Sequence, residues 1–243
     1  HGWVLLPDSE VHGDGPYPLL LSIHGGPFAQ YTSALFDEAQ VYAGAGYAVA
    51  MCNPSGSAGY GFDHGRSIVG AMGGIDADDV LAFVDHVLGD DRFPTDAARV
   101  GVMGGSYGGY MTATLTTRTD RFVAAIVERG YLDAGSFFGS SDIGWFFPGQ
   151  YHGSIADGVV QTPMAHVDRV TTPTLVIHSE ADWRTPVEQG QRWYAELKAR
   201  GVRTELLLFP GEGHELSRSG RPRHRRARFD HILRWWSEHL PVD

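Results

Sequence analysis

The sequence predicts an α/β protein with one mostly parallel, doubly wound sheet and helices on both faces. Short apolar runs typical of buried strands alternate with stretches of helical periodicity. The alternation shows no internal repeat, as in open parallel sheets. Because 42% of the 243 residues are hydrophobic, the chain can bury one sizeable core. We therefore expect a single domain over residues 1–243.

The segments before residue 97 fit this alternation. Strands are expected at 2–7, 19–23 and 47–52, and helices at 34–45 and 77–88. A long turn-rich loop, 53–61, follows the third strand. Asp76, Asp78 and Asp79 suit the positive end of the second helix, so we do not interpret them as metal ligands.

The second part of the chain continues the pattern. Strands are expected at 98–103, 122–127, 174–178 and 204–209, and helices at 110–118, 187–200 and 229–240. Segment 131–151 is unusually aromatic for a linker and carries Phe137, Phe138, Trp145, Phe146 and Phe147. These rings either pack a cap onto the core or line a pocket for an apolar side chain, and the sequence leaves both readings open.

The sequence Gly104-Gly105-Ser106-Tyr107-Gly108-Gly109 joins an expected strand to an expected helix. A serine at so sharp a turn has strained backbone angles, which neighbours without side chains make tolerable. The turn presents the Ser106 hydroxyl above the sheet, beside the free N–H groups of a helix start. This is the G-x-S-x-G nucleophile elbow of the α/β-hydrolase fold; the alternative is a glycine-rich surface turn with an idle serine.

An elbow serine needs a base and an acid that orients the base, in the chain order serine, acid, histidine. The acids after a buried strand are Glu180 and Asp182, and Asp182 is preferred as the shorter acid in the loop itself. His214 is the histidine in a loop after a later strand, whereas His178 lies at a strand end and suits a core role. We expect an acyl-enzyme mechanism that needs no metal or other cofactor.

The loop His24-Gly25-Gly26-Pro27 follows a buried strand, at the sheet edge where ligands bind in open α/β folds. Its glycines permit close backbone approach, so we expect the N–H groups of Gly26 and Tyr107 to form an oxyanion hole. A tight strand-to-loop turn without function is the alternative for this loop.

Charge and cysteine content narrow the possible partners. The net charge of −10 disfavours nucleic acid and anionic membranes. A local arginine cluster is expected to be a solvated helix face rather than a dock for an acidic partner: Arg218, Arg221, Arg223, Arg225, Arg226 and Arg228. Cys52 is the only cysteine, so no intrachain disulfide can form; we expect a buried, inert thiol and a cytoplasmic location.

Together these motifs resemble the catalytic domain of the prolyl oligopeptidase family of serine peptidases, and its acylaminoacyl peptidase branch in particular. The resemblance covers nearly the whole chain and includes Asp182-Trp183-Arg184-Thr185-Pro186, Gly213-His214 and Leu216 to Gly220. It implies hydrolysis of short peptides by Ser106, Asp182 and His214. It also implies that Arg184 contacts a substrate carbonyl and that the segment from Phe137 to Phe147 lies near the apolar specificity pocket.

Two departures from the family pattern stand out. Ser55 occupies a position where the family usually carries arginine. The family also places a β-propeller before this domain, and nothing in this chain resembles one, so we expect the hydrolase domain of a larger protein. Assembly into a homo-oligomer is left open. A carboxylesterase on the same fold and a non-catalytic binding module remain the competing readings.

Overall fold

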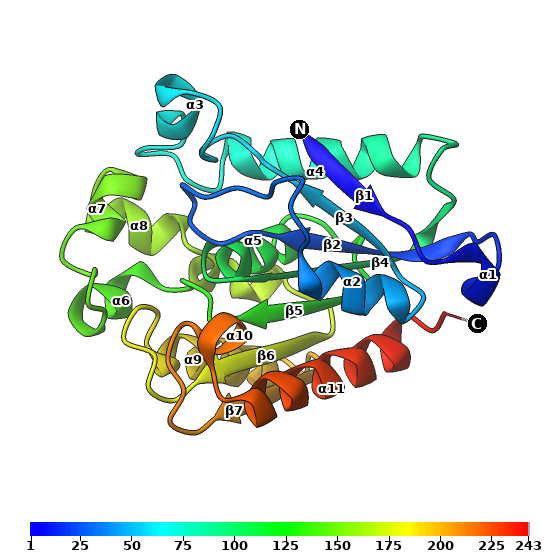
Figure 1. Cartoon of the computed structure of the whole chain (residues 1–243). Coiled ribbons are helices and arrows are strands. Elements are labelled where there is room, and N and C mark those ends of the chain that lie inside the picture. The colour runs from blue at the N-terminus through cyan, green and yellow to red at the C-terminus, as the bar shows by residue number, and fades with distance from the viewer. Residues whose placement is uncertain (243) are drawn as a thin grey trace.

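The computed structural model describes residues 1–242 and contains a seven-stranded sheet in the order β1-β3-β2-β4-β5-β6-β7 (Figure 1). The strands are β1 (Gly2–Leu5), β2 (Tyr17–Ile23), β3 (Ala48–Cys52), β4 (Thr95–Gly105), β5 (Ala124–Glu128), β6 (Thr174–Ser179) and β7 (Thr204–Phe209). Strand β1 pairs antiparallel with β3, and every other pair is parallel. The predicted mostly parallel sheet is confirmed.

Helices cover both faces of the sheet. The longer ones are α2 (Asp37–Gly44), α4 (Ile75–Leu88), α5 (Tyr107–Thr116), α9 (Val187–Ala199) and α11 (Pro222–His239). The shorter ones are α1 (Ser9–His12), α3 (Phe62–Arg66), α6 (Ala134–Ser140), α7 (Phe147–His152), α8 (Ile155–Gln161), the 3-10 helix η1 (Pro163–Arg169) and α10 (Leu216–Ser219).

Side chains that alternate along each strand enter separate cores. On β2, Leu19 and Leu21 pack with helices α4 and α5, whereas Leu20 packs with α2 and α11. The second core holds the buried Trp235 and Trp236 of α11. Helices α2 and α11 lie on the face that is turned to the viewer in Figure 1. Burial on both faces explains why these strands read as continuous apolar runs.

The element boundaries differ from the sequence prediction at helix starts. The helix expected from residue 34 begins at Asp37, and the helix after the elbow begins at Tyr107 rather than Tyr110. The final helix begins at Pro222, seven residues before the expected start, because proline is well suited to the first helical turn. Segment 131–151, for which no element was assigned, contains α6 and nearly all of α7.

The arginine cluster is not uniformly solvated. Arg218 and Arg225 are paired near the surface with Glu215 and Asp37. Arg228, in contrast, is buried, so the expectation of a solvated helix face is wrong for this residue. It lies on the same side of α11 as Ile232, Trp235 and Trp236, the spacing of a core-facing stripe.

Cys52 is buried, as expected, and burial raises the pKa of its thiol to about 12. Within residues 1–242, no helix is long and apolar enough to cross a membrane. The same residues contain no group of three or more His, Cys, Asp or Glu side chains placed to hold a metal ion.

Candidate active site

Ser106 occupies the sharp turn between β4 and α5. Its backbone has φ 63° and ψ −120°, a conformation that costs energy for any residue with a side chain. The approach around it is close: a Cβ on Gly104 would lie 2.6 Å from the carbonyl carbon of Gly108, and one on Gly108 would lie 2.1 Å from the oxygen of Ile23. Glycine is therefore required on both sides of the serine.

The elbow is also held by main-chain hydrogen bonds. The N–H of Ser106 donates to the Glu128 carbonyl over 3.1 Å, and its own carbonyl accepts from the N–H of Tyr110 over 2.9 Å. These contacts fix the turn to the end of β5 and to helix α5. The Ser106 hydroxyl is left free to face the carboxyl edge of the sheet.

The structure brings His214 and Asp182 to this hydroxyl. Nε2 of His214 lies 3.0 Å from the Ser106 Oγ, and Nδ1 lies 2.8 Å from Oδ2 of Asp182. Both distances are those of hydrogen bonds, so the imidazole links the serine hydroxyl to the carboxylate. The three residues are far apart in sequence and come from loops after β4, β6 and β7. Glu180, the alternative acid, is exposed.

Asp182 is buried and its carboxylate is fully hydrogen-bonded. Oδ1 accepts from the backbone N–H groups of Arg184 and Thr185, both over 2.9 Å, and the Thr185 hydroxyl lies 3.1 Å from Oδ2. Burial alone would raise the pKa of Asp182, but the hydrogen bond and charge of His214 and the N–H of Thr185 hold it below the usual value. The acid therefore stays ionised beside the imidazole.

Thr185 is a site residue that sequence reasoning missed. Its hydroxyl lies 2.9 Å from the Arg129 carbonyl, 3.1 Å from Asp182 Oδ2 and 3.2 Å from His214 Nδ1. The Thr185 carbonyl in turn lies 2.7 Å from Nε2 of His178. His178 is buried, as expected of a core residue, and burial lowers its pKa, so the imidazole is neutral near pH 7.

The loop after β2 passes directly beside the nucleophile. A Cβ on Gly25 would lie 3.5 Å from the Cβ of Ser106, and Gly26 shares a small cavity with Ser106 and Tyr107. Tyr107 is the first residue of α5, so its N–H has no partner within the helix. Among the described residues, neither the Gly26 nor the Tyr107 N–H donates to another group, so both are available to an oxyanion.

The side chain of Tyr107 anchors the elbow from the opposite direction. Its hydroxyl donates to Oδ2 of Asp76 over 2.7 Å, and the N–H of Gly73 donates to the same oxygen. Burial raises the pKa of Asp76 despite these donors. Asp79 accepts from the N–H of Ser55 over 2.8 Å. Asp76 thus supports the elbow, and Asp79 holds the loop that follows β3.

The small cavity beside Ser106 has a volume of about 60 Å³ and is mainly aromatic. Of the aromatic residues expected in a pocket, Phe137 and Phe147 line it, together with Tyr110 and Tyr131. The rings of Phe137 and Tyr131 meet edge to face with centroids 4.6 Å apart. Segment 131–151 therefore both packs onto the core and lines a pocket.

The other three rings that the sequence suggested do not line this cavity: Phe138, Trp145 and Phe146. Trp145 is 76% exposed and Phe138 is 45% exposed, so neither packs into the core. The backbone of α6 turns Phe137 inward and its neighbour outward, which sequence alone did not distinguish. Trp145 and Phe146 contact each other outside the cavity, with centroids 4.8 Å apart.

Arg184 lines the rim of the same small cavity. Its guanidinium is paired with Asp142, with Nε 2.8 Å and Nη2 3.2 Å from the two carboxylate oxygens. The pair is half exposed and links the loop after β6 to the segment between α6 and α7. Arg184 is thus held at the mouth of the aromatic pocket.

A buried ion network lies behind the elbow. Arg228 donates to both carboxylate oxygens of Glu128, over 2.8 Å and 2.6 Å, and to Glu38 over 2.9 Å. Arg129 is also paired with Glu128. Burial opposes ionisation of Glu128, but the charges of Arg129 and Arg228 outweigh it and hold its pKa well below the usual range. Sequence reasoning placed none of these groups near the site.

Comparison with known proteins identifies similar sequences and structures. The chain is 41% identical to the uncharacterized peptidase YuxL of Bacillus subtilis over 99% of its length and 37% of that protein. It is 32% identical to the acylamino-acid-releasing enzyme of Arabidopsis thaliana over 93% of this chain and 30% of that one. The solved acylaminoacyl peptidase of Pyrococcus horikoshii matches with a TM-score of 0.92 and 30% identity, over 99% of this chain and 39% of that one.

The chain thus spans between 30% and 39% of the length of these relatives. A family model described as the prolyl oligopeptidase family matches residues 33–242. That range includes the elbow, the loop of Asp182 and the loop of His214. The resemblance read from the motifs is confirmed, and the chain belongs to the prolyl oligopeptidase family.

Proposed function

We propose that this chain is a serine peptidase domain that hydrolyses short peptides and releases N-acylated or N-terminal amino acids. The proposal rests on the hydrogen bonds that link the three side chains. His214 Nδ1 lies 2.8 Å from Asp182 Oδ2, and His214 Nε2 lies 3.0 Å from Ser106 Oγ. The names of relatives, acylamino-acid-releasing enzyme and acylaminoacyl peptidase, support the substrate class.

In the proposed reaction, His214 Nε2 takes the proton of Ser106 as Oγ attacks the scissile carbonyl carbon. The ionised Asp182 holds the Nδ1–H tautomer and stabilises the imidazolium. The oxyanion receives hydrogen bonds from the N–H groups of Gly26 and Tyr107, each contributing on the order of 10²–10³ in rate. His214 then gives its proton to the leaving amine as the C–N bond breaks. In the second half His214 deprotonates a water that attacks the acyl carbon, and the bond to Ser106 Oγ breaks as Oγ regains the proton.

The aromatic cavity is the proposed site for the side chain of the acylating residue. It adjoins both Ser106 and the two oxyanion donors and is lined by Tyr110, Phe137 and Phe147. At about 60 Å³ it suits an apolar side chain of modest size. Arg184 at its mouth is proposed to reach the carbonyl of the preceding residue or acyl group, which requires it to share its guanidinium with Asp142.

Two further features stay predictions. A β-propeller before this domain is implied by the family resemblance and supported by the greater length of the relatives. A cytoplasmic location is supported by the lack of any possible intrachain disulfide, since Cys52 is the only cysteine.

The test is the Ser106→Ala variant assayed on N-acetyl-aminoacyl anilides and on short acetylated peptides. Loss of the nucleophile should lower kcat by about 10⁶ and abolish labelling by a fluorophosphonate. Ser237→Ala, which removes an exposed hydroxyl on α11, is the matched control and should change neither. Labelling that persists in the Ser106 variant would remove the mechanism.

A matched ester and amide pair separates the peptidase from a carboxylesterase. Acyl transfer to serine does not depend on whether the leaving group is an amine or an alcohol. Turnover of the ester with none of the amide would favour the esterase. Failure of the wild-type protein to react with the fluorophosphonate would favour a binding module.

A further inference from the structure

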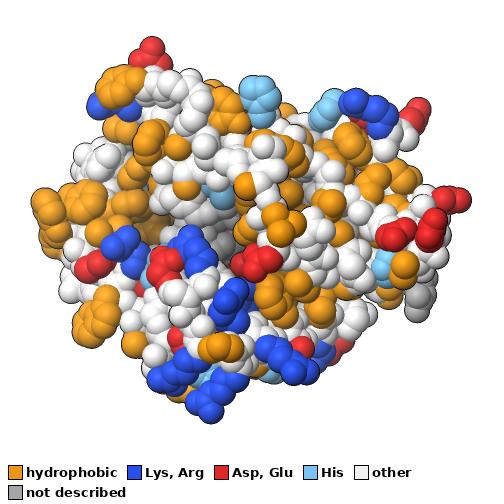
Figure 2. Space-filling view, in the orientation of Figure 1, with side chains coloured by type: hydrophobic (Ala, Val, Ile, Leu, Met, Phe, Trp, Pro, Cys, Tyr) orange, Lys and Arg blue, Asp and Glu red, His pale blue; other side chains and the backbone are white. Residues whose placement is uncertain are grey.

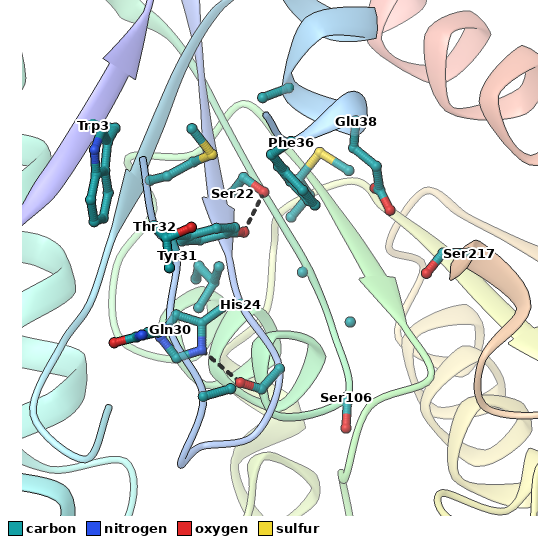
Figure 3. Close-up of a pocket in the computed structure, with 18 of the residues that line it drawn as sticks. Trp3, Ser22, His24, Gln30, Tyr31, Thr32, Phe36, Glu38, Ser106 and Ser217 are labelled. Atoms are coloured by element: carbon teal, nitrogen blue, oxygen red, sulfur yellow. Dashed lines mark hydrogen bonds between the residues drawn. The ribbon is translucent and has the colours of Figure 1, made fainter. Parts of the chain in front are cut away.

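A second, much larger cavity of about 840 Å³ begins at Ser106 and extends away from the aromatic pocket. Figure 3 shows Ser106 at one end, Ser217 and Glu38 along one side, and Trp3 and Tyr31 on the other. Figure 2 shows a hollow on this face with acidic and basic side chains along its rim. The aromatic pocket and this cavity share Gly26 and Ser106, so they meet at the nucleophile.

Arg129 lines this cavity, and its backbone has an unusual conformation. Its φ of 39° is a left-handed value that arginine seldom adopts. Two hydrogen bonds hold the strained backbone: its N–H donates to the Ile177 carbonyl over 2.8 Å, and its carbonyl accepts from the Thr185 hydroxyl over 2.9 Å. Strain that the surrounding structure maintains in this way is typical of functional sites.

The guanidinium of Arg129 lies against the residue that precedes the nucleophile. A Cβ on Gly105 would be only 2.9 Å from Cζ of Arg129, so the guanidinium packs directly against the backbone of this glycine. The residue is 8% exposed, and what remains accessible faces the cavity that it shares with Ser106. A buried cation therefore lies next to the residue that precedes Ser106.

The hydrogen-bonding capacity of this cation is not used up. Nη2 donates to the Ser217 hydroxyl over 3.1 Å. Nη1 lies 2.6 Å from Oε1 of Glu128, an ion pair whose geometry is not that of a hydrogen bond. Within the described part of the chain, Nε and Nη1 have no hydrogen-bond partner. These two atoms are enclosed, but Nη2 carries two N–H groups and only one of them has a partner, the Ser217 hydroxyl, so the second is the donor left for a ligand in the cavity.

The charges around Arg129 favour a neutral acceptor. Glu128 and Glu38 balance Arg129 and Arg228, and these four side chains form one continuous set of ion pairs. A carboxylate added to this set would be uncompensated, whereas a carbonyl oxygen would accept a hydrogen bond without adding charge. Peptide carbonyl oxygens are such acceptors, and a peptide leaving group carries one on each of its residues.

We propose that Arg129 donates a hydrogen bond to a backbone carbonyl oxygen of the leaving peptide, and so makes the site selective for peptide leaving groups. This inference rests on the proposed peptidase function. It assigns the large cavity to the residues that follow the cleaved bond. A small aromatic amine or an alcohol, which carries no such carbonyl, gains nothing from Arg129.

The test compares three substrates with one acyl part: an N-acetyl-aminoacyl anilide, an N-acetyl-aminoacyl-dipeptide amide and the same peptide with a free carboxylate. Arg129→Met should lower kcat/KM about 10- to 100-fold on both peptides, as expected for a hydrogen bond to a charged group. Its kcat/KM on the anilide should fall much less than on the peptides, and thermal unfolding checks that the variant folds, because it leaves the buried Glu128 with Arg228 as its remaining partner. Arg226→Met makes the same change on α11 away from the cavity and should alter none of the three rates.

A binding measurement separates this proposal from the proposed catalysis. In a Ser106→Ala background, calorimetry should show that Arg129→Met weakens binding of the dipeptide amide by a similar factor and leaves binding of the anilide unchanged. If the wild-type protein cleaves nothing and this difference persists, the peptidase function fails and the subsite stands. Three results would overturn the proposal. The variant could lose kcat/KM equally on the anilide and the peptides, or lose neither kcat/KM nor affinity on either peptide. It could also lose kcat/KM only on the peptide with the free carboxylate.

Discussion

Replacing Asp182 by asparagine tests the role of the carboxylate that is hydrogen-bonded to His214, because the structure determines the orientation of the new amide. Oδ1 of Asp182 accepts from two backbone N–H groups, those of Arg184 and Thr185, both over 2.9 Å. The amide NH₂ of asparagine cannot take this place without facing two donors. It must therefore occupy the position of Oδ2, which lies 2.8 Å from Nδ1 of His214.

An NH₂ group in that position donates to Nδ1 and forces the imidazole into the tautomer that carries its proton on Nε2. Nε2 then donates to Ser106 and cannot accept the proton of the hydroxyl. We expect kcat to fall by about 10⁴, the cost of the wrong tautomer in a serine triad. The fall should be larger than the loss of one hydrogen bond to a charged group, which is worth about 10- to 100-fold.

The assay is single-turnover acylation by an N-acetyl-aminoacyl nitrophenyl ester, together with the rate of fluorophosphonate labelling. Glu180→Gln is the matched control, because Glu180 is an exposed acid two residues away and its neutralisation should leave both rates unchanged. Thermal unfolding of each variant shows whether the fold is retained. A well-folded Asp182→Asn protein with less than a 100-fold loss would refute the argument from the two N–H donors.

Two further predictions concern the support of the elbow. Asp76→Asn should stabilise the protein at pH 7 and leave its stability unchanged below about pH 3.8, because burial raises the folded-state pKa of Asp76 and its ionisation costs stability as pH rises through that pKa. Urea unfolding at pH 7 and pH 3 measures the free energies of unfolding, and a variant that is less stable than wild type at pH 7 would contradict the prediction. Gly108→Ala should lower the free energy of unfolding by at least about 3 kcal/mol or prevent folding, because its Cβ would lie 2.1 Å from the Ile23 oxygen. The control Gly139→Ala should be tolerated, because no atom lies within 4 Å of its Cβ. Soluble yield and unfolding temperature compare the two variants, and equal behaviour would show that the elbow can relax.

Local patterns were enough to predict the elbow and the loops that carry the acid and the base. The G-x-S-x-G pattern specifies its own backbone, and the order serine, acid, histidine selected Asp182 and His214 from several candidates. Arg228 was misjudged although its signal was present: it precedes Ile232, Trp235 and Trp236 at the spacing of a helix face that packs on the core.

Contacts between distant segments were not predictable in this way. From the sequence, Thr185 has no expected role beyond its place in the motif from Asp182 to Pro186. Its hydroxyl lies between Arg129, Asp182 and His214 only because the ends of β5 and β6 meet. The partnership of Asp76 with Tyr107 likewise depends on how α4 packs beside α5. Segment 131–151 lacks helical periodicity, so the inward direction of Phe137 and the outward direction of Phe138 follow from tertiary packing.

The dependence of Glu128 on Arg228 has a consequence for a chain that is still being synthesised. Ser106, Glu128, Asp182 and His214 all leave the ribosome before Arg228 does. Until helix α11 arrives, the carboxylate behind the nucleophile lacks its bidentate partner and resists being enclosed. We expect the proposed peptidase activity to appear only after that helix has docked.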